Sequence, residues 1–405
     1  MSLTGPLFLN GIIVLTGAAF LGIVVAWPRL TPQTPWRIAG RVVALLLVNL
    51  LVLLTAATQL NSAYLFFAGW SDLRGAITGH TVQTGLDRGG AATRAPDSAV
   101  AGGAAVLPAH VPALTRPTGP SGTLRYRVHG ALSGLTGTVL VLLPTGYASA
   151  TASGVRYPVL EALHGYPSEP MNWVKIFHIK QAIDQQVRAR RLGPTLVVIP
   201  QIEIPRGVDT EAVNGGPGQP QIETWLTRDV PDWLVQHFRV SGHRNAWATI
   251  GYSSGGFAAA MSTVLHPAQY GAGIVLGGYF RPEFGPFYEP FSDTSSAGRH
   301  YDLARVIRHR PPPVSLWVET SHADPVSYGS TARFLRSVRS PTAVHAVFLQ
   351  NAGHRDSVWI RLLPQALRWL GANVNGFHPR SDRSIPRKSV VSAGAAGRRS
   401  AEPGH

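Results

Sequence analysis

Cysteine is missing from the 405-residue chain, so disulfides, thiolate nucleophiles and cysteine-based zinc sites are excluded. Histidine occurs 15 times but never in a His-x-x-x-His or comparable ligand spacing, so we expect neither a metal nor an organic cofactor. Lysine occurs only at positions 175, 180 and 388, and the formal net charge of +15 therefore comes from arginine. The arginines are scattered, without a basic helix that carries interleaved aromatic residues. This pattern argues against nucleic-acid binding.

Charged residues of either sign make up only 14% of the chain, and two long runs near its start have none. These runs, 6–27 and 42–60, approach the roughly 20 apolar residues that cross a bilayer core. A buried core helix rarely reaches this length without a polar face. A signal peptide would begin with basic residues, and Met1 to Gly5 contain no Lys or Arg. Residues 1–71 are therefore predicted to be a membrane anchor with two transmembrane helices.

The loop between the two runs predicts the orientation of the anchor. It carries Arg29, Arg37 and Arg41 and no acidic residue, which places it in the cytoplasm by the positive-inside rule. The rest of the chain then lies outside, as an extracellular domain on a multi-pass membrane protein whose anchor contacts lipid. The aromatic residues at 64, 66, 67 and 70 indicate an interfacial belt or a short amphipathic helix that packs on the domain.

Two segments are poor in residues that could build a core. Residues 72–122 are rich in Gly, Ala, Thr and Pro and are predicted to be a flexible tether. Residues 376–405 contain six arginines or lysines and are predicted to be a disordered basic tail near anionic lipid headgroups.

Between these segments, residues 123–375 alternate short β-rich runs with longer helical patterns. This alternation predicts an α/β domain whose mostly parallel sheet has helices on both faces. The first two strands are close together and indicate an antiparallel start. The predicted strands are 124–128, 138–143, 159–163, 196–199, 246–250, 274–276, 314–318 and 343–348.

The most informative motif is Gly251-Tyr252-Ser253-Ser254-Gly255, which joins a predicted strand directly to a predicted helix. This is the nucleophile-elbow pattern of the α/β-hydrolase fold, in which small neighbours allow a serine to occupy a strained turn. The serine hydroxyl then stands at the N-terminus of the helix, where backbone N–H groups can meet negative charge. We therefore predict that Ser253 is a catalytic nucleophile.

A serine nucleophile needs a base and an orienting acid, which in this fold follow it in the order acid, then histidine. His354 comes after the last predicted strand and is the candidate base. Asp324 follows the strand before it and is the preferred acid, with Glu319 at the end of that strand as the alternative. His322 and His345 fit less well, because one precedes the acid and the other falls within a strand.

An oxyanion hole needs two N–H donors. Ser254 would give one, and Tyr166, in the loop after an earlier strand, would give the other, since Pro167 has no N–H. The neighbouring His164 shapes this loop or contacts substrate. Trp173 and Trp359 are candidates for a substrate pocket, although such residues are more often part of a core.

These motifs resemble the Putative esterase family, which includes esterase D, enterochelin esterases and the secreted mycolyltransferases of actinobacteria. The resemblance covers about 123–370 and also includes the segments 157–165, 223–231, 266–267 and 353–354. It implies a serine carboxylesterase or acyltransferase with Ser253, His354, Tyr166 and Ser254 in the roles given above. The chain departs from the mycolyltransferases at His164 and Pro167, where they have an aspartate and an arginine.

Three functions follow from this sequence. The first is hydrolysis of a carboxylic ester or acyl lipid through an acyl-enzyme. The second is acyl transfer to a sugar or lipid hydroxyl, which would use the same residues. The third is a non-catalytic cell-wall binding protein, which the presence of all three catalytic residue types disfavours. The sequence does not indicate an oligomeric state.

Overall fold

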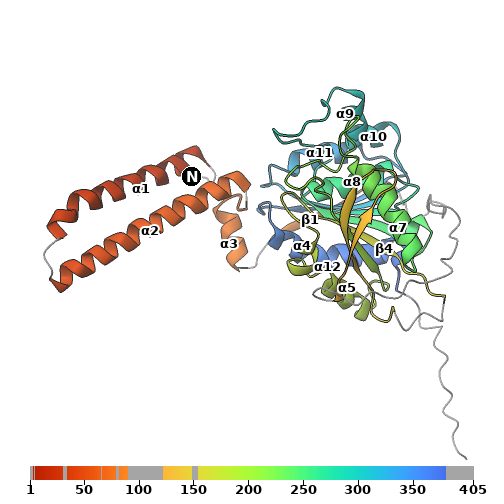
Figure 1. Cartoon of the computed structure of the whole chain (residues 1–405), viewed down its shortest axis with the longest axis horizontal. Coiled ribbons are helices and arrows are strands. Elements are labelled where there is room, and N and C mark those ends of the chain that lie inside the picture. Colours follow the sequence, from red (N-terminus) through yellow and green to blue (C-terminus); the bar gives the residue numbers. More distant parts are fainter. Residues whose placement is uncertain are drawn as a thin grey trace, which may run out of the picture.

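The computed structural model describes residues 3, 5–30, 34–64, 66–78, 82–89, 122–147 and 154–379. A helical hairpin and a larger α/β domain make up this part of the chain (Figure 1). The hairpin consists of α1 (Pro6–Ala26) and α2 (Pro35–Tyr64), with the 3-10 turn η1 (Trp27–Leu30) after α1. The two helices are joined by a hydrogen bond of 2.8 Å between the hydroxyls of Thr16 and Thr55.

Both helices of the hairpin are long and apolar enough to cross a membrane. The apolar spans, Pro6–Arg29 and Pro35–Ala63, have mean hydropathies of 2.3 and 2.4. Only 6% and 0% of the residues in their most apolar windows are buried, so these are not core helices of the domain. The second helix begins earlier than the predicted span because Pro35 starts it, in the first turn where proline fits best.

The α/β domain is built on a nine-stranded sheet with the order β1-β9-β8-β7-β6-β4-β5-β3-β2. The six central strands run parallel and are neighbours in the order β5, β4, β6, β7, β8 and β9. At one edge β3 pairs antiparallel with β5 and β2 with β3, and at the other edge β1 pairs antiparallel with β9. The strands are β1 (Gln83–Gly89), β2 (Leu124–His129), β3 (Thr136–Leu142), β4 (Val159–Leu163), β5 (Leu196–Pro200), β6 (Trp247–Tyr252), β7 (Ala272–Leu276), β8 (Ser315–Ser321) and β9 (Ala343–Leu349). The predicted fold class is confirmed.

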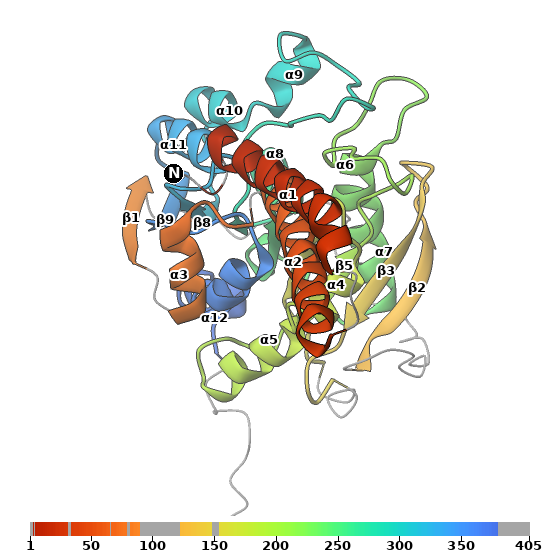
Figure 2. The same ribbon diagram turned by 90° about the vertical axis from the view of Figure 1, so that its left-hand side faces the viewer.

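Helices cover both faces of the sheet and form two hydrophobic cores (Figure 2). Residues of α7 (Val230–His237), α8 (Ser254–Leu265), α10 (Leu303–His309) and α11 (Tyr328–Ser337) pack in one core. Residues of α4 (Met171–Lys175), α5 (Ile179–Arg188) and α12 (Asp356–Asn373) pack in the other. Alternate strand residues face opposite cores, as Val141 and Leu142 do in β3. The remaining elements are α3 (Trp70–Thr78), α6 (Ile222–Thr224), η5 (Trp225–Asp229), η6 (Arg244–Ala246), α9 (Ser296–Tyr301) and η7 (Asn375–Phe377).

The prediction that 72–122 is entirely a tether was wrong, because α3 and β1 fall within or across its first part. All seven residues of β1 are exposed, so the strand has no apolar pattern by which the sequence could indicate it. Backbone pairing with β9, together with a contact of 2.6 Å between Asp87 and His345, holds β1 at the sheet edge. Residues 90–121 lie outside the described residues.

The predicted start of the tail at 376 was slightly too early. The side chain of Phe377 is fully buried in the second core, so the domain includes η7. Residues 380–405, which contain most of the predicted basic tail, lie outside the described residues.

Candidate active site

Ser253 occupies the turn between β6 and α8 with a positive φ of 56° and a ψ of −127°. Two glycines make this turn possible. A Cβ at Gly251 would overlap the carbonyl oxygen of Gly255, and a Cβ at Gly255 would overlap the carbonyl oxygens of Leu163 and His164. The strand, the strained serine and the close backbone approach together form the expected nucleophile elbow.

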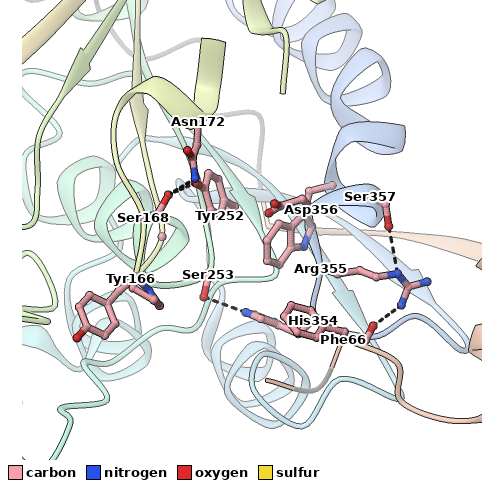
Figure 3. Close-up of a pocket in the computed structure, with 13 residues that line it drawn as sticks. Phe66, Tyr166, Ser168, Asn172, Tyr252, Ser253, His354, Arg355, Asp356 and Ser357 are labelled. Carbon is pink, nitrogen blue, oxygen red and sulfur yellow. Dashed lines mark hydrogen bonds between the residues drawn. The ribbon is translucent and has the colours of Figure 1, made fainter. Parts of the chain in front are cut away.

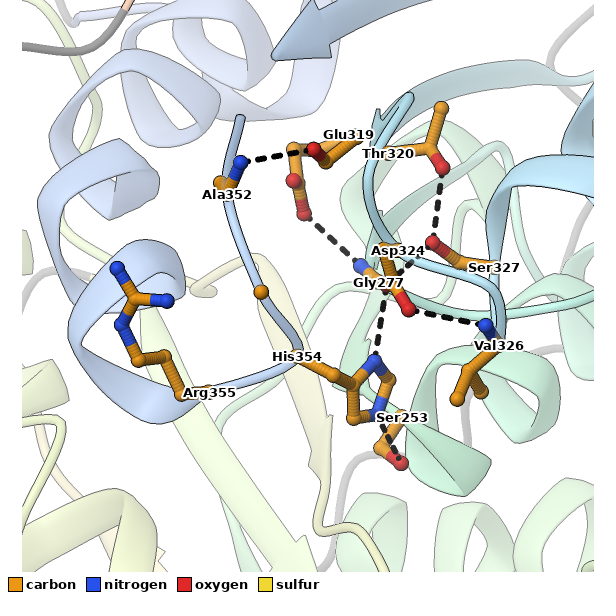
Figure 4. A network of polar contacts seen from close by, with 12 residues as sticks. Ser253, Gly277, Glu319, Thr320, Asp324, Val326, Ser327, Ala352, His354 and Arg355 are labelled. Carbon is orange, nitrogen blue, oxygen red and sulfur yellow. Dashed lines mark hydrogen bonds and ion pairs between the residues drawn. The ribbon is translucent and has the colours of Figure 1, made fainter. Parts of the chain in front are cut away.

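A continuous chain of hydrogen bonds joins Ser253, His354 and Asp324 (Figure 4). His354 Nε2 lies 2.9 Å from Ser253 Oγ, and His354 Nδ1 lies 3.0 Å from Asp324 Oδ2. The histidine and the aspartate follow the C-terminal ends of β9 and β8, which are adjacent in the sheet. The parallel sheet therefore brings together three side chains that are far apart in the sequence.

Asp324 is surrounded by donors that stabilise its charge. Burial acts to raise the pKa of this carboxyl, but the hydrogen bonds from His354, from the Ser327 hydroxyl at 2.6 Å and from the Val326 N–H at 3.0 Å outweigh burial and lower it. The aspartate is therefore ionised at neutral pH, as a partner of an imidazolium must be.

Glu319 lies in β8 and is placed differently. One oxygen accepts a hydrogen bond of 3.0 Å from the Gly277 N–H, and the side chain is buried. Burial, and then the nearby charge of Asp324, raise the pKa of Glu319 to about 8. The carboxyl is mostly uncharged at pH 7, and among the described contacts Asp324 alone binds His354 Nδ1.

A pocket of about 500 Å³ opens over the Ser253 hydroxyl (Figure 3). Its polar wall is a short hydrogen-bonded chain in which Ser168 Oγ lies 2.7 Å from both Tyr252 Oη and Asn172 Nδ2. The indole of Trp359 meets the ring of His354 edge-on, with 4.9 Å between centroids. The lining residues are Phe66, Gly165, Tyr166, Pro167, Ser168, Asn172, Tyr252, Ser253, His354, Arg355, Asp356, Ser357 and Trp359.

The two expected oxyanion donors lie on either side of Ser253. Ser254 is the first residue of α8, and N–H groups in the first turn of a helix have no partner within the helix. Tyr166 lines the pocket directly after Gly165, where an added Cβ would lie 3.2 Å from Ser253 Cβ. Both residues therefore border the space in which a carbonyl oxygen would lie when bound at Ser253.

Two residues predicted to contact substrate do not line this pocket. His164 is fully buried, where its Nε2 accepts from the Ile202 N–H at 3.2 Å and its Nδ1 lies 2.9 Å from the Gly165 carbonyl oxygen. Burial lowers the pKa of His164 to about 4, so the ring is a neutral support for the loop. Trp173 is fully buried against Phe177 in the second core. The third candidate, Trp359, lines the pocket.

The sequence did not indicate the positions of some residues of the site and of the motifs. Phe66, which the sequence places in an interfacial aromatic belt or on a short amphipathic helix, lines the pocket. Asp72 binds the loop of His354, and the only signal for it is that it is the first acidic residue of the chain. Glu223, from the segment shared with esterases, lies outside the pocket and is bonded to Tyr301 and His266.

Among the described residues, no group of three or more His, Asp or Glu side chains is arranged to hold a metal ion.

The fold has clear relatives among solved structures. A ferulic acid esterase is 18% identical and superposes with a TM-score of 0.52, covering 62% of this chain and 98% of its own. An S-formylglutathione hydrolase from Agrobacterium tumefaciens is 15% identical, with a TM-score of 0.53 and coverages of 64% and 99%. The elbow, the sheet order and these similarities define the α/β-hydrolase fold.

Within that class, the profile of the family described as Putative esterase matches residues 134–370. The chain belongs to this family. An uncharacterized protein of Corynebacterium glutamicum is 29% identical over 137 residues, which cover 32% of this chain. The match spans only 30% of that relative's length.

Proposed function

We propose that the chain is a serine carboxylic-ester hydrolase that works through an acyl-enzyme. The observation that carries the proposal is the chain of hydrogen bonds from Asp324 through His354 to Ser253 at the floor of an open pocket. Ser253 is the nucleophile, His354 the general base and Asp324 the residue that orients the imidazole and stabilises its protonated form.

In the first half of the reaction, Ser253 Oγ attacks the ester carbonyl carbon while His354 Nε2 takes the hydroxyl proton. The N–H groups of Tyr166 and Ser254 receive the oxyanion. Collapse of the tetrahedral intermediate breaks the bond to the alcohol oxygen, which leaves with the proton from His354. A water molecule, deprotonated by the same imidazole, then attacks the acyl-enzyme and releases the carboxylic acid.

Acyl transfer uses the same steps with a hydroxyl compound in place of water. The polar wall of Ser168 and Asn172 supports this second possibility, because it offers hydrogen-bonding groups beside the nucleophile. Product analysis with a lipid ester and added sugar or glycerol acceptors distinguishes the two: transfer gives a new ester, and hydrolysis gives only the free acid.

The proposal includes a site of action outside the membrane. The exposed apolar surfaces of α1 and α2 support a hairpin that crosses the bilayer twice, and so do Arg29, Arg37 and Arg41, which lie in η1 and the start of α2 between the two uncharged runs. The α/β domain would then lie on the extracellular side.

The decisive experiment compares the full chain with a Ser253→Ala variant. We expect the parent protein to hydrolyse p-nitrophenyl esters and to be labelled covalently by a fluorophosphonate, and the variant to lose both properties. A parent protein that is folded but neither labelled nor active contradicts the proposal and favours a non-catalytic binding protein.

A further inference from the structure

The segment that follows α2, residues 66–78, is tied to the membrane hairpin. Asn61, in the last turn of α2, bonds to the backbone of Phe67 in both directions: its Oδ1 accepts from the N–H at 2.7 Å, and its Nδ2 donates to the carbonyl at 3.0 Å. Trp70 meets Phe8 of α1 edge-on, with 5.7 Å between ring centroids. The position of the segment is therefore set by the hairpin.

The same segment is bound to the loop that carries His354. The Asp72 carboxylate is 2% exposed and accepts the Gly353 N–H at 2.8 Å and two N–H groups of Arg355 at 2.6 and 2.7 Å. Its Oδ2 also accepts the Ala68 N–H at 3.0 Å. Asp72 thus holds the residues on both sides of His354. It holds Gly353 by a hydrogen bond and Arg355 by a bidentate, nearly buried ion pair.

A second set of contacts strengthens this connection. The Arg355 guanidinium donates to the Phe66 carbonyl at 2.6 Å and lies over the ring of Phe67, 4.7 Å from its centroid. A charge buried in this way needs its partner, because an unpaired guanidinium would be costly. Movement of residues 66–72 would therefore move the loop that sets the distance from His354 to Ser253.

The pocket itself reaches this segment. The side chain of Phe66 lines the pocket together with Ser253 and His354, and Figure 3 shows it beside His354 with Tyr166 across the site. Phe66 comes two residues after Tyr64, the last residue of α2. At about 3.5 Å per extended residue, the pocket wall lies within roughly 7 Å of chain from the end of the apolar helix.

The outer face of α3 is apolar and suits a membrane interface. Trp70 and Ile77 are seven positions apart, so they lie on the same side of the helix, and they are 52% and 80% exposed. Asp72 points instead into the domain. An apolar face with a tryptophan at its start is typical of a helix at a membrane interface.

We infer that residues 66–78 are part of the active site. Asp72 is a positioning residue for the loop of His354, and Phe66 forms the wall of the pocket nearest the membrane. The ester that reaches Ser253 is accordingly a lipid whose acyl chain enters from the bilayer that holds α1 and α2. This inference rests on the proposed ester chemistry of Ser253 and names its substrate class.

The test uses the full chain in phosphatidylcholine vesicles with two substrates, p-nitrophenyl acetate in the water and p-nitrophenyl palmitate in the bilayer. We expect palmitate to be the better substrate by kcat/KM. Phe66→Ala should lower kcat/KM for palmitate about tenfold more than it lowers kcat/KM for acetate, because only the long chain needs the wall. The matched control is Phe287→Ala, since Phe287 is 97% exposed and does not line the pocket.

The positioning role is tested with Asp72→Asn, which keeps the shape of the side chain but removes its charge. We expect kcat for both esters and the rate of fluorophosphonate labelling to fall roughly 10- to 100-fold, with KM nearly unchanged. Asp72→Glu should restore part of the labelling rate. The control is Asp293→Asn, which should leave the rates unchanged because both side chains of the ion pair between Asp293 and Arg281 are exposed.

The possible results distinguish a failure of the ester chemistry from a failure of lipid entry or of positioning by Asp72. A parent protein that is neither labelled nor active overturns the proposed function, and with it this inference. A parent protein that is active, but whose palmitate-to-acetate ratio is unchanged by Phe66→Ala, overturns the lipid entry alone. Unchanged labelling of Asp72→Asn overturns the positioning role.

Discussion

At the scale of residues, two buried carboxyl groups that are only five positions apart, Asp324 and Glu319, have opposite charge states at neutral pH. Asp324 receives hydrogen bonds from His354, Ser327 and Val326, which hold its pKa below the usual value. Glu319 receives one bond, from Gly277, and its pKa is raised to about 8. The number of donors therefore decides which carboxyl can carry the charge opposite an imidazolium.

This contrast predicts different effects of two conservative substitutions. Asp324→Asn should lower kcat for a p-nitrophenyl ester by about 10³- to 10⁴-fold, because the amide cannot stabilise the protonated imidazole. Glu319→Gln should keep most of the activity, since it replaces a mostly uncharged group with a neutral one of similar shape. Steady-state kinetics of the two purified variants check this, and the reverse order would make Glu319 the catalytic acid.

At the scale of elements, the site depends on how closely β6, α8 and the loop after β4 approach one another. Gly255 is the point of contact, because the carbonyl oxygens of Leu163 and His164 occupy the space of its missing side chain. His164 supports this loop from inside as a buried neutral ring. The proposed oxyanion donors and the proposed nucleophile are thus fixed by the packing of backbone on backbone.

Gly255→Ala should therefore disturb the elbow itself. We expect it to destabilise the protein by about 3 kcal/mol and to remove ester turnover, because a methyl group has no space there. Gly329→Ala is the matched control, since nothing lies within 4 Å of the Cβ at that helical position. The control should stabilise by about 0.5–1 kcal/mol and keep full activity. Thermal unfolding followed by tryptophan fluorescence measures the stability of both variants, and ester turnover measures their activity.

At the scale of the whole molecule, the chain has an apolar hairpin at one side of an α/β-hydrolase domain (Figure 1). The hairpin is not isolated from the chemistry, because Asp72 connects the segment after α2 to the loop of His354. A domain tethered in this way would stay close to the bilayer surface instead of exploring the full length of a flexible linker.

The absence of cysteine allows a direct test of the membrane topology. We expect Phe287→Cys, on the α/β domain, to react with a membrane-impermeant maleimide on intact cells, because the side chain is 97% exposed. Thr34→Cys, just before α2, should react only after the cells are permeabilised. Any labelling of the parent chain would be background, since it has no thiol. The opposite pattern would place the domain in the cytoplasm.

The sequence by itself determined the elements that depend on local patterns. The two uncharged runs, the alternation of strands and helices and the glycines around Ser253 are properties of short segments, and the fold class follows from them. The sequence also indicated Asp324 and His354 as candidates, because residues after parallel strands gather at one edge of a sheet.

Only the tertiary structure decided how distant segments meet. It left His164 and Trp173 inside the protein, placed Trp359 at the pocket, and gave Glu319 and Asp324 different partners. It also brought Asp72 to the loop of His354, 281 residues away from Gly353 in the chain. Hydrogen bonds and burial of this kind depend on contacts across the chain, so no local pattern records them.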